Sequence, residues 1–177
     1  MQKNYRIIRG FLKPKEIKVL KTYALKCYEN NLLQANGVSH SRNWAKVEDL
    51  PKVPKEFFLV KERIIKFFDL LEAKDEPSFS SYVSCVDRLG QIHQHRDLVE
   101  KGFKHFRCNI LVQKPKKGGL PIIDGDVLNV EEGDLWAFNP DRHLHGSQVV
   151  LELPIRINYS FGWSISSKTR QVKEDGL

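Results

Sequence analysis

Residues 90–97, Gly-Gln-Ile-His-Gln-His-Arg-Asp, bring two imidazoles and a carboxylate close together in the sequence. His93, His95 and Asp97 would share one side of an extended backbone, because successive side chains of a strand point to opposite faces. Imidazole and carboxylate groups are common metal ligands. We therefore predict that His95 and Asp97 hold a metal ion, if a third ligand comes from elsewhere in the chain.

A second group of histidines offers that ligand. Residues 133–138 predict a turn followed by a strand, and residues 139–147 predict a turn that contains His143 and His145. His145, which directly precedes Gly146, is the predicted third ligand, and His143 is the alternative. Two histidines and one carboxylate that leave one face of the metal open form the Fe(II) site of non-haem oxygenases. Together these residues predict an iron centre.

Three predicted strands carry polar side chains on one face and apolar side chains on the other. The alternation runs through residues 154–163, residues 106–113 and residues 82–85. The polar positions are Tyr82, Ser84, Arg107, Asn109, Arg156, Asn158 and Ser160. In a half-exposed antiparallel sheet such faces meet water, but their position around the metal motif favours a polar interior.

Arg156 is the most informative of these polar residues. If the apolar face of its strand packs on helices, its guanidinium points into the interior of the sheet. A buried charge left without a partner costs about 3–5 kcal/mol, so Arg156 must meet either a protein carboxylate or a bound anion. A guanidinium matches a ligand carboxylate through two parallel hydrogen bonds.

The remaining segments must supply the elements that hold these residues in place. Residues 14–27 and residues 54–73 predict two helices, each with one buried face. Residues 30–52 are polar and irregular, and we expect either a substrate-covering loop, with His40 and Trp44 as its most useful side chains, or a mobile surface segment. Two helices followed by strands predict an α+β domain, with the helices against one face of a sheet or barrel.

The composition indicates one soluble domain. The chain has 177 residues, of which 41% are hydrophobic and 29% charged, enough for a core without disulfides. Cys27, Cys85 and Cys108 lie far apart, which argues against a disulfide framework and favours the reducing cytoplasm. Neither a signal peptide nor a stretch of about 18 apolar residues is found, so we expect no membrane partner. The net charge of +7 is spread along the chain, which disfavours nucleic acid as a partner.

The chain resembles the Fe(II)- and 2-oxoglutarate-dependent dioxygenases. Members of this superfamily carry His-x-Asp near the start of a double-stranded β-helix, a distal His near its end, and a basic residue shortly afterwards. His95, Asp97, His145 and Arg156 follow that order, and the likeness spans about residues 78–163. The resemblance implies a double-stranded β-helix (jelly roll, cupin-like), Fe(II) held by the first three residues, and Arg156 paired with the distal carboxylate of 2-oxoglutarate.

Within this superfamily, the sequence looks most like the aspartyl/asparaginyl β-hydroxylase group, which includes free-proline hydroxylases. The matching segments are Ser84, residues 89–95, residues 107–109 and residues 131–138. The opening residues 5–12 look like the N-terminal segment of many members of the whole superfamily. The likeness implies that Ser84, Arg107 and Asn109 lie near the metal-chelating end of 2-oxoglutarate, with Tyr82 on the same face. Two positions depart from the group: the animal aspartyl hydroxylases lack a carboxylate equivalent to Asp97, and Asn109 stands where the group usually has His.

These observations together predict the organisation and the function. We expect a single oxygenase domain with a strand and helical support region at residues 1–77, a double-stranded β-helix core at residues 78–165 and a polar tail at residues 166–177. The resemblance implies hydroxylation of a C–H of an amino acid or protein side chain, with O2 and 2-oxoglutarate consumed and succinate and CO2 released, by a monomer or a homodimer. The substrate would be a small molecule or a peptide.

Two alternatives remain open from the sequence. The first is a cupin-like binding module that is not an enzyme or that holds another metal, with Arg156 receiving a different acid. The second is a nucleic-acid demethylase, whose Arg-x-Asn-x-Thr-x-Arg run is similar to residues 156–160. Gly162 stands where the final Arg of that run should be, and this departure disfavours the demethylase.

Overall fold

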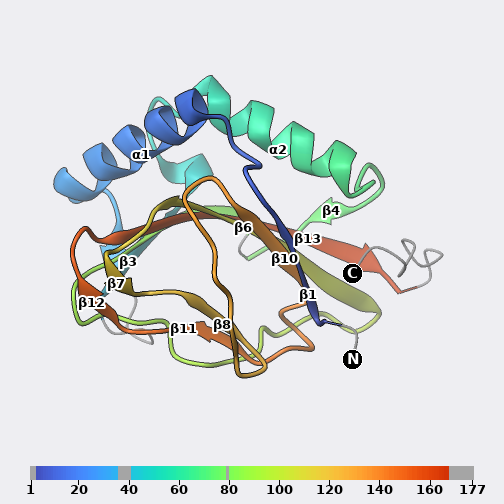
Figure 1. The fold of residues 1–177 in the computed structure, drawn as a ribbon. Helices are drawn as coiled ribbons and strands as arrows, with labels where there is room; N and C mark the ends of the chain where they lie inside the picture. Colours follow the sequence, from blue (N-terminus) through green and yellow to red (C-terminus); the bar gives the residue numbers. More distant parts are fainter. Residues whose placement is uncertain (1–2, 36–40, 79, 168–177) are drawn as a thin grey trace.

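The structure is a computed structural model, and it describes residues 3–35, 41–78 and 80–167. Helices α1 (Pro14–Glu29) and α2 (Lys55–Phe67) lie next to each other on one face of a large sheet, at the top of Figure 1. Short strands and loops form a second layer on the opposite side of that sheet (Figure 1). The predicted α+β arrangement, with both helices on one sheet, is confirmed.

The large sheet is antiparallel and contains the strands that carry most of the predicted site. Its order is β1 (Tyr5–Ile8), β10 (Leu135–Phe138), β6 (Phe103–Gln113), β13 (Arg156–Ser166), β5 (Ser81–Val86), β3 (Arg42–Lys46) and β2 (Gln34–Ala35), with β4 (Lys74–Asp75) paired to β13. The long strands β6 and β13 are neighbours at its centre. The sheet therefore draws strands from both predicted regions, residues 1–77 and residues 78–165.

The apolar face of this sheet packs on the helices. The inward residues of β13 on this face are Ile157, Tyr159, Phe161 and Trp163, all buried. Phe57 of α2 stacks on Phe161 with ring centroids 5.2 Å apart, and the Tyr159 hydroxyl donates a hydrogen bond to the Leu20 carbonyl of α1 at 3.0 Å. Because side chains alternate along a strand, the polar residues of β13 point away from the helices.

The opposite layer is made of short strands. β11 (His145–Ser147), β8 (Pro121–Ile123) and β9 (Asp126–Val127) form one small sheet, and β12 (Val150–Glu152) pairs with β7 (Lys117–Gly118). A second apolar cluster is composed of Leu111, Ile123, Leu128, Val130, Trp136 and Phe138. Since these residues come from both layers, the cluster joins the layers, and Ile123, Trp136 and Phe138 of it also line a cavity between them.

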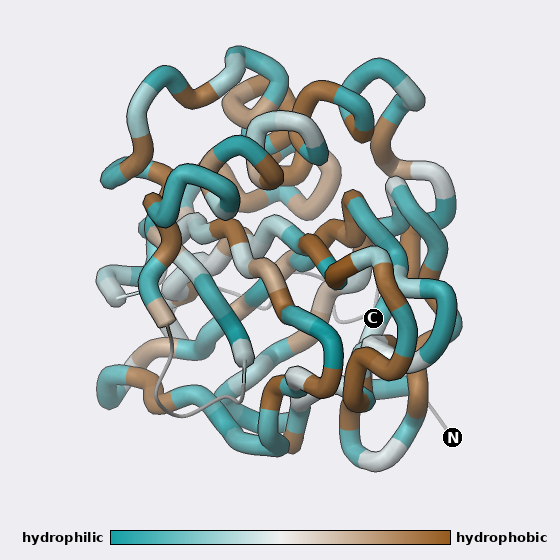
Figure 2. The backbone as a smooth tube through the Cα atoms, turned by 90° about the vertical axis from the view of Figure 1, so that its left-hand side faces the viewer, coloured by the Kyte–Doolittle hydropathy of each residue, from teal (hydrophilic) through white to brown (hydrophobic). Residues whose placement is uncertain are grey.

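Hydrophobic and hydrophilic stretches alternate along most of the chain, as Figure 2 shows. Among the described residues, no helix combines the length and the apolar character needed to cross a membrane. Cys27, Cys85 and Cys108 are buried and free, which agrees with the expectation of a fold without disulfides.

Both helices begin where the sequence predicts, within one residue, but the second helix ends earlier than predicted. Pro14 opens α1, and the Glu16 carboxylate accepts a hydrogen bond from the Lys13 backbone N–H at 2.8 Å. The prediction that the second helix extends to residue 73 was wrong, because α2 ends at Phe67. Asp69 turns the chain with a φ of 52°, so the apolar residues after it belong to a turn.

The expectation of an irregular segment at residues 30–52 was wrong in part. Residues 34–35 form β2 and residues 47–49 form a short 3-10 helix. The main difference concerns residues 42–46. These residues form β3, which pairs with β5 inside the large sheet. In this strand only Ala45 is fully buried, so the apolar alternation that marks other strands is absent. Trp44 contacts Tyr82 edge-on, with ring centroids 6.0 Å apart. His40 lies outside the described residues, as does the predicted tail from residue 168 onward.

Candidate metal centre

His95 and His145 are brought together by a short backbone bridge. Each residue donates its backbone N–H to the other's carbonyl at 2.9 Å, and the two imidazole centroids are 4.3 Å apart. Gly146 permits this approach, because a Cβ there would lie 2.7 Å from the Ile92 carbonyl oxygen. The bridge thus joins two segments that are far apart in the sequence.

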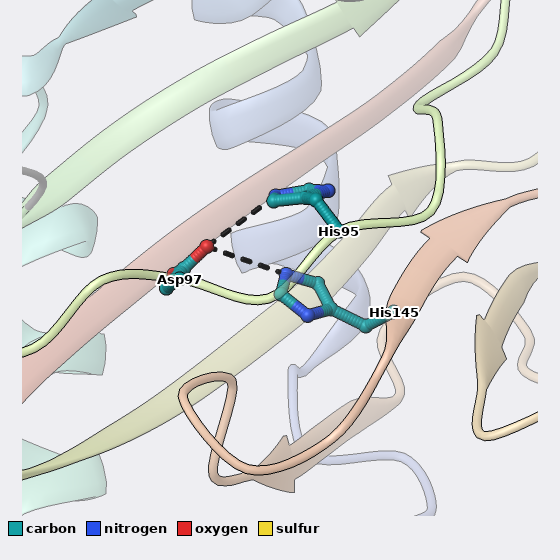
Figure 3. A group of neighbouring side chains, drawn as sticks. All are labelled: His95, Asp97 and His145. Carbon is teal, nitrogen blue, oxygen red and sulfur yellow. Dashed lines mark ion pairs between the residues drawn. The ribbon is translucent and has the colours of Figure 1, made fainter.

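Asp97 completes the group, and its side chain points at both imidazoles in Figure 3. Its Oδ1 lies 3.3 Å from Nε2 of His95 and 3.6 Å from Nε2 of His145. One ligand atom from each of the three residues lies within 4.8 Å of the others. The donor set of two imidazole nitrogens and one carboxylate oxygen fits a divalent transition metal.

The Nδ1 atoms of His95 and His145 form hydrogen bonds that fix the orientation of both imidazoles. Nδ1 of His95 contacts the His93 carbonyl at 2.8 Å, and Nδ1 of His145 contacts the His143 carbonyl at 3.1 Å. A carbonyl only accepts hydrogen bonds, so each Nδ1 carries a proton, and Nε2 is the nitrogen of each ring that faces Asp97 and would bind a metal.

The protonation of the group also suits a metal. Burial alone would raise the pKa of Asp97, but the hydrogen bond with His95 and the charge of Arg107 hold that pKa well below its usual range. Burial lowers the pKa of His145 to about 4, while the hydrogen bond with Asp97 raises the pKa of His95. Asp97 is therefore ionised and His145 neutral at neutral pH, which are the forms that bind metals, whereas a metal would displace the proton that His95 shares with Asp97.

The other two histidines of the motifs lie outside this group. His93 contacts Gln91 at 3.1 Å, and residues 91–94 do not form the regular strand from which a shared side of His93 and His95 was expected. His143, the alternative third ligand, instead contacts the Asp124 carboxylate at 2.7 Å. Among the described residues, the structure thus brings His145, and not His143, to Asp97.

Arg107 and His105 of β6 contact the far side of Asp97. Oδ2 of Asp97 lies 3.4 Å from Nη2 of Arg107 and 3.5 Å from Nδ1 of His105. Nη1 of Arg107 also donates to the Ser160 hydroxyl at 3.0 Å. No sequence motif marks His105, although its position two residues before Arg107, on the same face of a strand, is a usable signal.

A cavity of about 490 Å³, its open mouth included, adjoins the three predicted ligands. Its walls include Tyr82, Arg107, Asn109, Arg156 and Asn158 from the polar face of the large sheet. The predicted polar interior is therefore present.

Arg156 lies in the wall of this cavity with only 2% of its surface exposed. Its Nε and Nη1 atoms find no hydrogen-bond partner among the described residues, and no ion pair with a described carboxylate is formed. Its guanidinium lies over the Trp136 ring, 6.0 Å from the centroid. Burial lowers the pKa of Arg156 to about 10, so the group stays charged at neutral pH. Of the two partners considered from the sequence, a protein carboxylate is thus not found among the described residues.

Arg42 is a cavity residue that the sequence analysis missed. It lies on β3, and its Nε donates to the Ser84 hydroxyl at 2.8 Å. Ser84 is fully buried and is not among the residues lining the cavity. Arg42 and Arg156 both pair with Val86 of β5, from its two sides. No motif marks Arg42, because the strand that carries it has no apolar alternation.

No family model and no curated protein matches this sequence. The fold, however, is similar to that of solved oxygenase structures. A Pseudomonas putida prolyl-4-hydroxylase has a TM-score of 0.73 and 12% identity over 92% of each chain. A viral collagen prolyl hydroxylase from Paramecium Bursaria Chlorella virus-1, solved as a 2OG complex, has a TM-score of 0.67 and 17% identity over 92% of this chain and 96% of that one.

A third similar structure is that of HygX from Streptomyces hygroscopicus with nickel, 2-oxoglutarate and hygromycin B bound. Its TM-score is 0.64, with 12% identity over 92% of this chain and 83% of that chain. At these identities the likeness concerns the fold alone. The chemistry must be argued from the residues of the cavity.

Proposed function

We propose that this chain is an Fe(II)- and 2-oxoglutarate-dependent dioxygenase that hydroxylates a C–H of an amino acid or protein side chain. The observation that carries the proposal is the buried guanidinium of Arg156, which has no described hydrogen-bond partner for two of its nitrogens and lies in the same cavity as His95, Asp97 and His145. A metal group and a separate carboxylate receptor in one cavity suit a co-substrate that chelates a metal at one end and carries a carboxylate at the other.

The proposal extends to the domain and to its fold. We propose that residues 3–167 form one oxygenase domain, in which the large sheet and the short strands opposite it are the two layers of a double-stranded β-helix. Support comes from the cavity between these layers and from the similarity to the prolyl hydroxylases and HygX.

In this proposal His95, Asp97 and His145 hold the iron, and Arg156 binds the distal carboxylate of 2-oxoglutarate. When bound, the iron supplies the oxidation chemistry by which O2 and 2-oxoglutarate yield succinate, CO2 and a hydroxylated product. The protein's own contribution is to fix positions: the two Nδ1 hydrogen bonds hold the imidazoles, and Arg156 holds the far end of the co-substrate.

The other predicted co-substrate residues take different places around the cavity. Tyr82 and Asn109 line it directly, and we propose that they contact 2-oxoglutarate. Arg107 also lines the cavity and in addition contacts Asp97. Ser84 does not line the cavity, and we propose that it acts through Arg42, from which its hydroxyl accepts a hydrogen bond.

The charges of the cavity bear on the substrate. Of the described residues that line it, Arg42, Arg107 and Arg156 are cationic side chains and Asp97 is the one carboxylate. This excess of positive charge suits a cavity that receives acids, and it is consistent with a small molecule or a peptide that carries a carboxylate.

The experiment that tests the proposed function is an assay of 2-oxoglutarate consumption and succinate formation against free amino acids and short peptides. We expect succinate to appear only when Fe(II), 2-oxoglutarate and a substrate from these sets are present, and to disappear when a chelator removes the metal. If metal and 2-oxoglutarate both bind but no succinate forms with any compound, the chain is a binding module instead.

A further inference from the structure

His105 lies directly behind the metal group, and the inference concerning it rests on the proposed function. The residue is on β6 with 2% of its surface exposed. Its side chain contacts Asp97 on one side and lines a second cavity on the other, together with Leu98, Val99 and Glu76. A buried imidazole in this position touches a predicted metal ligand without belonging to the group itself.

The contact with Arg107 determines which nitrogen of His105 carries its proton. Nη2 of Arg107 lies 2.9 Å from Nε2 of His105. A guanidinium has donors and no acceptor, so Nε2 must accept this hydrogen bond. The ring is then the neutral tautomer with its proton on Nδ1, and that nitrogen faces Oδ2 of Asp97 at 3.5 Å.

The two oxygens of Asp97 consequently have different surroundings. Oδ1 faces the imidazoles of His95 and His145, at 3.3 Å and 3.6 Å. Oδ2 lies 3.4 Å from Nη2 of Arg107 and 3.5 Å from Nδ1 of His105. This Nδ1 is buried and has no hydrogen-bond partner among the described residues, and Oδ2 is the carboxylate oxygen that it faces. A carboxylate whose second oxygen accepted hydrogen bonds from these two groups would present only its first oxygen to a metal.

We propose that His105 is a positioning residue that, through Nδ1, keeps Asp97 as a ligand with one oxygen. A carboxylate that bound through both oxygens would occupy an additional coordination position. By holding Oδ2, His105 leaves that position to 2-oxoglutarate. Partners that orient metal ligands in this way typically change metal affinity or activity by about 10–100-fold when they are removed.

The backbone of His105 has a separate structural role, which a side-chain substitution leaves in place. Its N–H donates to Oδ1 of Asp141 at 3.3 Å. Substitutions at this position therefore test the ring nitrogens, and two amide side chains distinguish them. Asn places its amide nitrogen where Nδ1 of His lies, whereas the amide of Gln reaches the place of Nε2.

The test compares His105→Asn with His105→Gln by titrating the metal-free proteins with Co(II) and then with 2-oxoglutarate. We expect the Asn variant to retain the Co(II) affinity within about threefold and to keep the visible Co(II) spectrum. We expect the Gln variant to bind Co(II) about 10–100-fold more weakly, with an altered spectrum and weaker binding of 2-oxoglutarate to the Co(II)-saturated protein. His105→Met, which has no donor, replaces the Gln variant if that variant does not fold.

Three results would overturn the inference. One is a Gln variant with the affinity and spectrum of the unmodified protein, which would mean that Nδ1 does no positioning. Another is an equal loss in the Asn and Gln variants, which would indicate that the ring serves only packing. The third is an unmodified protein that binds no Co(II), and this result alone would also overturn the metal centre of the proposed function.

Discussion

Replacement of Asp97 by Ala is expected to lower the metal affinity, and with it any 2-oxoglutarate turnover, by at least about 100-fold. Removing a residue that only orients a metal ligand typically lowers metal affinity or activity by about 10–100-fold. Asp97 is itself a predicted ligand, so the loss should be larger. Its Oδ1 is the oxygen that faces both imidazoles. Without this carboxylate, the positive charge of Arg107 faces the site uncompensated by Asp97 and repels a cation.

A matched control for this substitution lies four residues earlier, in the same segment. His93→Ala removes an exposed imidazole that contacts Gln91 and takes no part in the group. Surface substitutions usually change stability by no more than about 0.5 kcal/mol, so metal affinity should stay within about threefold. Isothermal titration with Co(II) measures both variants. Equal losses in the two variants, or full affinity in Asp97→Ala, would contradict the predicted ligand set.

Replacement of Arg156 by Met is expected to change two properties in opposite directions. Binding of 2-oxoglutarate to the metal-loaded protein should weaken by about 30-fold or more, because removing one partner of a buried charge pair costs about 2–5 kcal/mol. The ligand-free protein, in contrast, should become more stable. Replacing buried charges by apolar residues of similar volume often gains about 1–4 kcal/mol, which corresponds to a melting temperature higher by roughly 2–16 °C.

The opposed directions separate loss of a binding group from loss of the fold. Calorimetric melting of the ligand-free protein and titration of the metal-loaded protein with 2-oxoglutarate provide the two measurements. Arg88→Met is the control, since Arg88 is exposed and should affect neither quantity appreciably. An Arg156→Met variant that binds 2-oxoglutarate as tightly as the unmodified protein would show that the guanidinium receives something else.

The sequence was most informative where strands have one apolar and one polar face. Alternation along residues 154–163 predicted that Arg156 lies on the side opposite the helices, and the burial of Ile157 and Phe161 against those helices agrees. The same alternation placed Arg107 and Asn109 correctly in the cavity wall. A period of two defines the face of every residue once the apolar face is known.

Periodicity failed where a strand has no apolar face of its own. In β3 the side chains of Arg42, Trp44 and Lys46 lie on the face shared with Tyr82, and Ala45 is the one fully buried residue. Such a strand resembles a polar loop in sequence. Its place in the sheet depends on pairing with β5, a contact between distant segments that local pattern does not encode.

The metal group itself depends on another contact of this kind. His95 and His145 meet through a backbone bridge that requires a residue without a Cβ at position 146. The sequence showed Gly146 beside His145 but not what lies opposite it. The arrangement of His105 behind Asp97 likewise follows from the approach of residues 95–97 to β6, which only the folded chain displays.

The most direct test of the proposed activity is an anaerobic optical titration of the metal-free protein with Fe(II) and then with 2-oxoglutarate. We expect a weak visible charge-transfer band that requires both additions, and that requires much more 2-oxoglutarate when Arg156 is replaced by Ala. Such a result would establish the metal group and the co-substrate in one cavity. The absence of a band at saturating Fe(II) and 2-oxoglutarate would contradict the assignment of His95, Asp97, His145 and Arg156, and a binding module would become the better description of this chain.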